Sequence, residues 1–172
     1  MTKFLLEKII KNSAPMLQPY LKFADAAAVL YALSVCESSG GTDRVPRYEK
    51  SYAPLGTNYK NEQPERYKVW GALSAISYSS FQIMYCTACE QGFDSAPYLR
   101  SPLELQNDEV AIFYVIEFIK NRVVAKGGSR VEDIPDSYNT GNFKDQIFNQ
   151  DYTKKFMANY NSLQKNADYI TT

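Results

Sequence analysis

The sequence contains no histidine among its 172 residues. Without an imidazole, the chain cannot form a serine–histidine–aspartate triad, a cysteine–histidine pair or a zinc site with histidine ligands. Any acid–base chemistry must therefore come from a carboxyl, amine, phenol or thiol group.

Cysteine is also scarce, with only Cys36, Cys86 and Cys89 in the chain. An odd number leaves at least one thiol unpaired, so the protein is not a disulfide scaffold. Cys86 and Cys89 have the spacing of a CxxC pair, but the chain has no second pair and no histidine to complete a zinc site. We interpret both as small buried apolar residues, and expect no metal and no cofactor.

The chain lacks an excess of either charge and lacks long apolar runs. Its 19 basic and 19 acidic residues give a formal net charge of zero. Nucleic-acid-binding proteins usually carry a basic excess, so no nucleic acid is expected as a partner. No stretch reaches the roughly 18 apolar residues of a membrane span. Glu7 and Lys8 interrupt the first apolar run, so we expect no membrane span and no signal peptide.

What the sequence does contain is a helical apolar pattern. Apolar residues make up 45% and charged residues 22%, values typical of a globular protein, and the length suits one domain over 1–172. No alternating pattern extends beyond four residues, so the expected fold class is mainly α. Helices are predicted over about 20–36, from a capping box at 101–104 through 110–119, and over 152–163 within the final segment 146–172.

The segment that follows the first of these helices differs in composition. Residues 41–63 are rich in glycine, proline and asparagine, and are predicted to form a long loop. Pro64 is placed to open a helix after this loop.

Glu37 follows the first buried helix directly. A helix C-terminus carries partial negative charge, and burial also disfavours a carboxylate, so both effects raise the pKa of the glutamate. A carboxylic acid that stays protonated near neutral pH is what a departing glycosidic oxygen requires.

Glu37 belongs to the first of three short motifs. Taken in order, these motifs resemble the soluble lytic transglycosylase family, within the goose-type lysozyme-like superfamily. The family pattern is Glu-Ser-Ser, then Gly-Leu-Met-Gln-Ile-Met, then Ala-Tyr-Asn-x-Gly. The corresponding segments here are Glu37-Ser38-Ser39, Ser79-Ser80-Phe81-Gln82-Ile83-Met84 and Ser137-Tyr138-Asn139-Thr140-Gly141.

The resemblance spans about residues 18–145 and has clear departures. Three residues of the second motif differ, with Ser79 where the family has glycine, and the third motif starts with Ser137 in place of alanine. The separation of Glu37 from Gln82 exceeds that of the family. We therefore interpret 45–65 as an insertion, and its tyrosines as a wall of the cleft.

The resemblance implies a lysozyme-like helical domain with a long loop insertion beside the cleft. It also implies cleavage of peptidoglycan at the β-1,4 bond between N-acetylmuramic acid and N-acetylglucosamine. Glu37 would act first as acid and then as base on the muramic acid C6 hydroxyl, giving a 1,6-anhydro product. Tyr138 would hydrogen-bond near Glu37 and orient it. The substrate would be held by Ser38, Ser39, Gln82, Met84 and Asn139.

Two other functions stay open. A hydrolytic muramidase needs a second carboxylate to activate water, and Asp43 is the nearest candidate in the chain. The domain could instead be a catalytically inactive glycan-binding or structural relative. A separate alternative for Tyr138 and Asn139 is a simple turn, in which the tyrosine only packs. Since no signal peptide is expected, we place the protein in a bacteriophage virion, in contact with other virion proteins and acting on the host cell wall in the periplasm.

Overall fold

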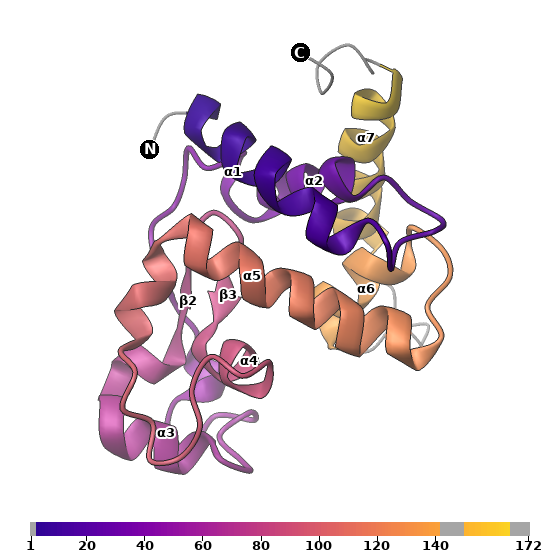
Figure 1. The fold of residues 1–172 in the computed structure, drawn as a ribbon. Helices are drawn as coiled ribbons and strands as arrows, with labels where there is room; N and C mark the ends of the chain where they lie inside the picture. Colours follow the sequence, from indigo (N-terminus) through magenta and orange to yellow (C-terminus); the bar gives the residue numbers. More distant parts are fainter. Residues whose placement is uncertain (1–2, 142–149, 166–172) are drawn as a thin grey trace.

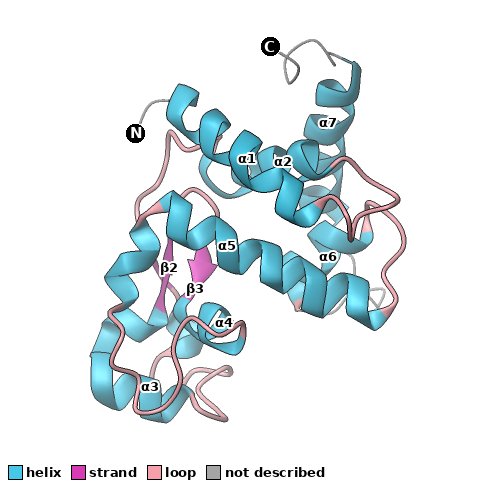
Figure 2. Ribbon diagram, viewed as in Figure 1, coloured by secondary structure: helices cyan, strands magenta, loops and turns pink. Residues whose placement is uncertain are grey.

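A computed structural model describes residues 3–141 and 150–165 of the chain. Helices dominate these residues, as Figure 2 shows, and the expectation of a mainly α fold is confirmed. No helix within the described ranges is long and apolar enough to cross a membrane. The α-helices are α1 (Lys3–Leu17), α2 (Ala26–Ser38), α3 (Gln63–Trp70), α4 (Tyr85–Glu90), α5 (Asp108–Phe118), α6 (Asp133–Thr140) and α7 (Gln150–Lys165).

A small antiparallel sheet was not predicted. Its strands are β1 (Arg47–Tyr48), β2 (Ile76–Tyr78) and β3 (Ile83–Met84), hydrogen-bonded in that order. Strands of two or three residues are too short to produce an alternating pattern in the sequence. The sheet matters for the site because β2 lies between β1 and β3, which brings Arg47 beside the second motif.

The buried helix α2 begins later than predicted. The expected start at residue 20 is wrong, because the chain turns there and α2 starts at Ala26. The Asp25 carboxylate caps the helix by accepting the Ala28 N–H at 2.7 Å, and the Gln18 side chain accepts the Ala26 N–H at 2.8 Å. The helix ends at Ser38, and the next residue, Ser39, has φ 52°.

The capping box at Ser101 does not open the long helix directly. The Ser101 hydroxyl accepts the Leu103 N–H at 3.3 Å, but this cap begins a 3-10 turn over Pro102–Gln106. Asn107 then caps α5 by accepting the Glu109 N–H at 2.9 Å. The predicted single helix is therefore two consecutive elements with one cap each.

Helix α5 crosses the middle of the molecule in Figure 1. Helices α1, α2 and α7 lie on one side of it, and the sheet, α3 and α4 lie on the other. Helix α2 packs against both α1 and α7, and α1 also packs against α5. The largest of the fully buried core side chains are Tyr78, Tyr85, Phe81, Phe156, Leu6, Leu17, Leu21, Leu30, Leu33, Ile83, Leu105 and Ile112.

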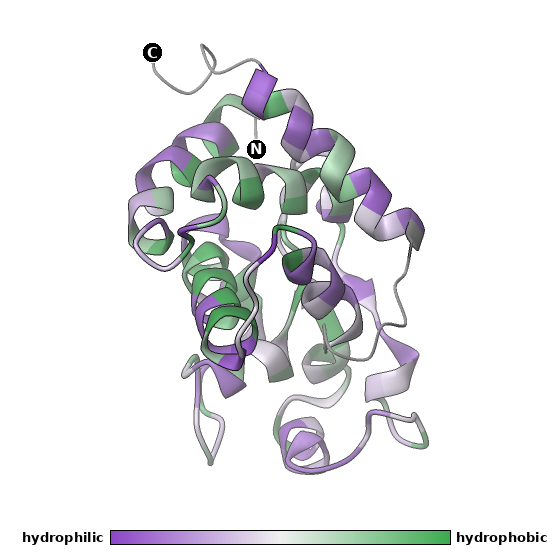
Figure 3. Ribbon diagram, turned by 90° about the vertical axis from the view of Figure 1, so that its right-hand side faces the viewer, coloured by the Kyte–Doolittle hydropathy of each residue, from purple (hydrophilic) through white to green (hydrophobic). Residues whose placement is uncertain are grey.

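The last described helix, α7, docks through one face. Phe156 is fully buried and Tyr160 is 8% exposed, and the Tyr160 hydroxyl accepts the Asp25 N–H at 3.1 Å. In Figure 3 this helix, which ends beside the C-terminal trace, carries both purple and green segments, as expected for an amphipathic helix. The predicted helix over 152–163 is confirmed.

The segment predicted as a long loop, 41–63, is folded rather than open. It contains β1 and a 3-10 turn over Lys50–Tyr52. The Gln63 amide donates to the Tyr52 carbonyl at 3.0 Å and to the Ser74 carbonyl at 3.2 Å. Since Gln63 is 2% exposed, these bonds anchor the segment to the body of the protein.

Asp136 joins α6 to α7 and has an unsatisfied carboxylate oxygen. Its Oδ1 accepts the Thr153 hydroxyl at 2.6 Å, while its Oδ2 is buried without a hydrogen-bond partner among the described residues. Burial raises the pKa of Asp136. The folded state then binds a proton more readily than the unfolded chain, so its stability falls as pH rises through the window above the unfolded pKa of about 3.9.

Replacing Asp136 by asparagine should remove this decrease of stability with rising pH. We expect the free energy of unfolding at pH 7 to rise by about 1 kcal/mol, because a buried charge disappears while the Thr153 bond is kept. Urea unfolding at pH 3 and pH 7 measures the effect. A difference between variant and parent that is the same at both pH values would contradict it.

Candidate active site around Glu37

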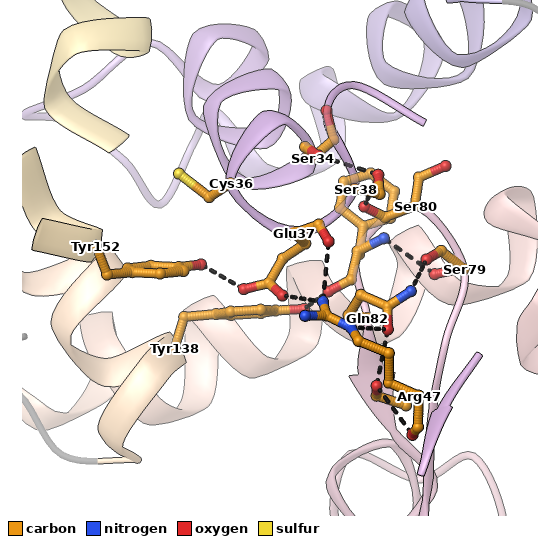
Figure 4. Close-up of polar contacts among 12 residues, drawn as sticks. Ser34, Cys36, Glu37, Ser38, Arg47, Ser79, Ser80, Gln82, Tyr138 and Tyr152 are labelled. Carbon is orange, nitrogen blue, oxygen red and sulfur yellow. Dashed lines mark hydrogen bonds and ion pairs between the residues drawn. The ribbon is translucent and has the colours of Figure 1, made fainter. Parts of the chain in front are cut away.

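Glu37 occupies the last turn of α2, and its side chain is 15% exposed. Each carboxylate oxygen has its own donor, as Figure 4 shows. The Tyr152 hydroxyl donates to Oε1 at 2.6 Å, and Arg47 Nη2 donates to Oε2 at 3.1 Å. Helix α7 and strand β1 thus hold the carboxyl group from two directions, leaving a small part of it open to solvent.

The pKa of Glu37 is raised. Burial is the largest cause, and it outweighs the hydrogen bond from Tyr152 and the positive charges of Arg47 and Lys155, which all favour the ionised form. This direction agrees with the expectation from the sequence. Protonated Glu37 can therefore serve as an acid, and its conjugate base has partners ready to stabilise it.

Two cations also cap the end of α2. Arg47 Nη2 donates to the Glu37 carbonyl at 2.9 Å, and Lys155 Nζ donates to the Cys36 carbonyl at 3.1 Å. The last carbonyls of a helix lack intrahelical partners and carry partial negative charge, so cations are favourable there. The site consequently gathers positive charge in a protein whose net charge is zero.

Tyr138 does not make the hydrogen bond predicted for it. Its hydroxyl donates to the Phe81 carbonyl at 2.8 Å, and its ring packs edge-on against Phe118 with centroids 5.4 Å apart. Figure 4 shows Tyr138 and Tyr152 both reaching toward Glu37. Burial, and to a smaller extent the negative charge of Glu37, raises the pKa of Tyr138. Tyr152 is the residue that orients Glu37, while Tyr138 lies beside it and fixes the second motif.

The two serines after Glu37 differ in burial. Ser38 was expected to contact sugar, but it is 2% exposed. Its hydroxyl donates to the Ser80 carbonyl at 2.7 Å and accepts the Gly41 N–H at 2.9 Å, so it links α2 to the second motif. Ser39 is exposed and remains accessible to a ligand.

Gln82 also bonds to protein groups rather than facing solvent. It is 7% exposed, and its Oε1 accepts Arg47 Nε and the Ser77 hydroxyl, both at 2.8 Å. Its Nε2 donates to the Ser79 carbonyl at 2.9 Å. Gln82 therefore positions Arg47, and through it Glu37. Met84 is half-buried at the start of α4.

Asn139 and Asp43 are exposed. Asn139 lies in the last turn of α6, directly after Tyr138. The Asp43 N–H donates to the Ser38 carbonyl at 2.9 Å, which keeps Asp43 near the end of α2. Neither side chain hydrogen-bonds to Glu37 in the part of the chain that the structure describes.

Three residues of the site were missed in the sequence. Tyr152 and Lys155 lie one turn apart on α7, and Tyr152 entered the prediction as the first residue of the helix over 152–163. A tyrosine at one end of the apolar face of a helix indicates only weakly that its hydroxyl group contacts a neighbouring element. Nothing in the sequence distinguishes Arg47 from the other basic residues of its segment.

No candidate metal site accompanies Glu37 in the described part of the chain. Residues 3–141 and 150–165 contain no group of three or more potential ligands placed to hold a metal ion. The three cysteines are free, and burial raises the pKa of Cys86 to about 12 and that of Cys89 to about 11. These thiols stay protonated at neutral pH, which agrees with their interpretation as buried apolar residues.

Replacing Tyr152 by phenylalanine should raise the pKa of Glu37 further. The hydroxyl favours the ionised carboxylate, so its removal leaves burial less opposed. Loss of a hydrogen bond to a charged group should also lower the free energy of unfolding by about 1.5–3 kcal/mol at a pH where Glu37 is ionised. The carboxyl carbon of Glu37, followed by NMR over pH, reports the shift.

Tyr138→Phe is the matched control, since this hydroxyl donates to the Phe81 carbonyl and not to Glu37. It should leave the midpoint of the Glu37 titration in place. Equal midpoints in the parent and in Tyr152→Phe would mean that the Tyr152 hydroxyl does not act on Glu37 in solution.

The three motifs are held together by side-chain hydrogen bonds at Ser38 and Tyr138. No family model matches the chain, and neither a curated protein nor a solved structure matches it. The chemistry of Glu37 and the groups around it is therefore the basis for any assignment of function.

Proposed function

We propose that the protein is a lytic transglycosylase, which cleaves the β-1,4 bond between N-acetylmuramic acid and N-acetylglucosamine in peptidoglycan. The observation that carries the proposal is the environment of Glu37. Its carboxyl group is largely buried, its pKa is raised, and it still reaches the surface. Such a group can donate a proton and later accept one, which is what a single-carboxylate mechanism requires.

In the first step, protonated Glu37 donates its proton to the glycosidic oxygen as the bond to C1 of muramic acid breaks. In the second step, the Glu37 carboxylate accepts the proton of the C6 hydroxyl while the C6 oxygen attacks C1. The product is a 1,6-anhydromuramic end, Glu37 is protonated again, and no water is consumed.

The neighbours of Glu37 have roles in these steps. Tyr152 holds Oε1 at 2.6 Å, which fixes the rotamer and leaves Oε2 as the oxygen that carries the proton. Arg47, 3.1 Å from Oε2, stabilises the carboxylate formed after the first transfer. The more loosely held oxygen is thus the one assigned to the reaction.

The contacts between the motifs support the proposal. The Ser38 hydroxyl bonds to the Ser80 carbonyl, and the Tyr138 hydroxyl bonds to the Phe81 carbonyl. Three segments far apart in the chain are therefore joined around one carboxyl group. Ser79 has φ 71°, a backbone conformation that favours glycine, and glycine is the residue at this position of the family motif.

Inverting hydrolysis is the second candidate, with Asp43 as the base that activates water. The bond from the Asp43 N–H to the Ser38 carbonyl, at 2.9 Å, is the observation in its favour, because it keeps this exposed carboxylate near Glu37. A catalytically inactive glycan-binding protein is the third candidate, and it needs no proton transfer from Glu37.

Mass spectrometry of the fragments released from purified peptidoglycan separates the three. A transglycosylase leaves anhydro ends, which are lighter by one water than the reducing ends left by a hydrolase. We expect anhydro ends. Reducing ends that disappear in Asp43→Asn would establish hydrolysis instead, and strands that are bound but not shortened would establish a binding protein.

A further inference from the structure

Arg47 has donor groups left over after it binds Glu37. Its side chain is 52% exposed, although it is hydrogen-bonded through Nε to Gln82 and through Nη2 to Glu37. The Nη1 group makes no hydrogen bond to any described residue. A guanidinium group has five N–H donors in a planar fork, so the two on Nη1 are available to a ligand.

The orientation of this guanidinium is fixed by a hydrogen bond to the buried side chain of Gln82. Gln82 accepts Arg47 Nε at 2.8 Å and is itself held by the Ser77 hydroxyl at 2.8 Å and by its bond to the Ser79 carbonyl at 2.9 Å. Gln82 is 7% exposed, so these bonds form inside the protein. A charged side chain supported in this way loses little rotamer freedom when it binds a ligand.

Lys155 adds a second cation on the α7 side of Glu37. It is exposed and donates to the Cys36 carbonyl at 3.1 Å. Among the charged groups that act on Glu37, these two are positive, while the other neighbours, Tyr138, Tyr152 and Cys36, are neutral at pH 7. The surroundings of the acid thus favour an anion.

We propose that Arg47 is the receptor for a carboxylate of the substrate, bound beside Glu37 through Nη1, with Lys155 as a second attracting charge. This inference rests on the proposed function and narrows its substrate class. The ligand is an acidic glycan strand that carries a carboxylate on or near the muramic acid lactyl group. A neutral N-acetylglucosamine polymer with the same β-1,4 linkage is disfavoured.

Binding at Arg47 also acts on the acid itself. A carboxylate on the guanidinium shares the positive charge that otherwise favours ionised Glu37, and it places a negative charge nearby. Both effects favour the protonated form of Glu37. Arrival of the correct substrate therefore increases the fraction of enzyme that holds the proton needed for the first step.

The first experiment uses two monosaccharide probes. N-acetylmuramic acid has a free carboxylate, and N-acetylglucosamine lacks it. NMR of the arginine side-chain N–H groups should show the Arg47 signal moving with the former probe only. Arg47→Ala should weaken binding of N-acetylmuramic acid by about tenfold, and Arg47→Lys should restore part of it, because lysine keeps the charge but not the fork.

Arg122→Ala is the matched control, since Arg122 lies in an exposed ion pair with Glu90, 2.6 Å away. It removes the same charge and should leave binding unchanged. Equal binding of the two probes, or undiminished binding in a folded Arg47→Ala variant, overturns the proposal. Circular dichroism establishes that each variant is folded.

The second experiment identifies which carboxylate is bound. Glu37→Gln is titrated with peptide-bearing strands, with strands freed of peptide, and with chitin oligomers of equal length. Tighter binding of peptide-free strands assigns the lactyl carboxylate, and tighter binding of peptide-bearing strands assigns the stem peptide. Chitin bound as tightly as either overturns the proposal. If the wild-type protein cleaves no strand yet N-acetylmuramic acid still binds at Arg47, the proposed function fails and the carboxylate site stands.

Discussion

Glu37→Gln should lower the rate of peptidoglycan solubilisation by about 10²–10⁴-fold, the range expected when a general acid is removed. Glutamine has nearly the same shape and can still accept the Tyr152 hydroxyl, but it has no proton to donate to a glycosidic oxygen. Turbidity loss of a peptidoglycan suspension measures the rate. The pH dependence of the parent should show an alkaline limb, because only protonated Glu37 starts the reaction, and the raised pKa moves this limb above the usual range of a glutamate.

Folding is the control for this result. Burial of the Glu37 charge disfavours the folded state at neutral pH, so its removal should not lower the melting temperature. Glu117→Gln makes the same chemical change on α5, where Glu117 forms a partly exposed ion pair with Lys120 just beyond the helix, and should retain full activity. A Glu37→Gln protein with the parental rate would exclude Glu37 as the acid.

Phe156→Ala should lower the free energy of unfolding by about 3–5 kcal/mol, the largest stability loss expected here. Phe156 is fully buried on the face of α7 that packs against α2. The substitution leaves a cavity between the two helices, and the same helix carries Tyr152 and Lys155. Lytic activity should therefore decrease already at temperatures below the one at which the variant unfolds, since Tyr152 no longer holds Glu37.

Urea unfolding measures this loss, and Lys154→Ala serves as the control because Lys154 is an exposed residue of the same helix. The control should change the free energy of unfolding by no more than about 0.5 kcal/mol. A Phe156→Ala protein as stable as the parent would mean that α7 does not dock on α2 in solution.

Patterns in the sequence predicted those parts of the fold that local chemistry determines. The apolar spacing of α7 and the proline at the start of α3 identified both helices, because each signal lies within the element itself. The start of α2 was missed because it depends on the Gln18 side chain, which accepts a backbone N–H eight residues away. The sheet was missed because its strands are two or three residues long.

Only those residues of the site that belong to the three motifs were predicted from the sequence. Glu37 was found because a carboxyl group at the end of an apolar helix has an expected electrostatic consequence, a raised pKa. Tyr138 and Tyr152 could not be ranked from the sequence, since the partner of a hydroxyl group depends on tertiary packing. The roles of Ser38 and Gln82 changed for the same reason: both lie below the surface, where their polar atoms bond to protein.

The bond from Tyr152 to Glu37 joins residues 115 positions apart in the chain. At a synthesis rate of 5–20 residues per second, a ribosome needs about 6–23 s to pass from one to the other. During that interval the acid exists but the hydroxyl that orients it does not. A nascent chain therefore carries no assembled site, and the complete site forms only when α7 has emerged and docked.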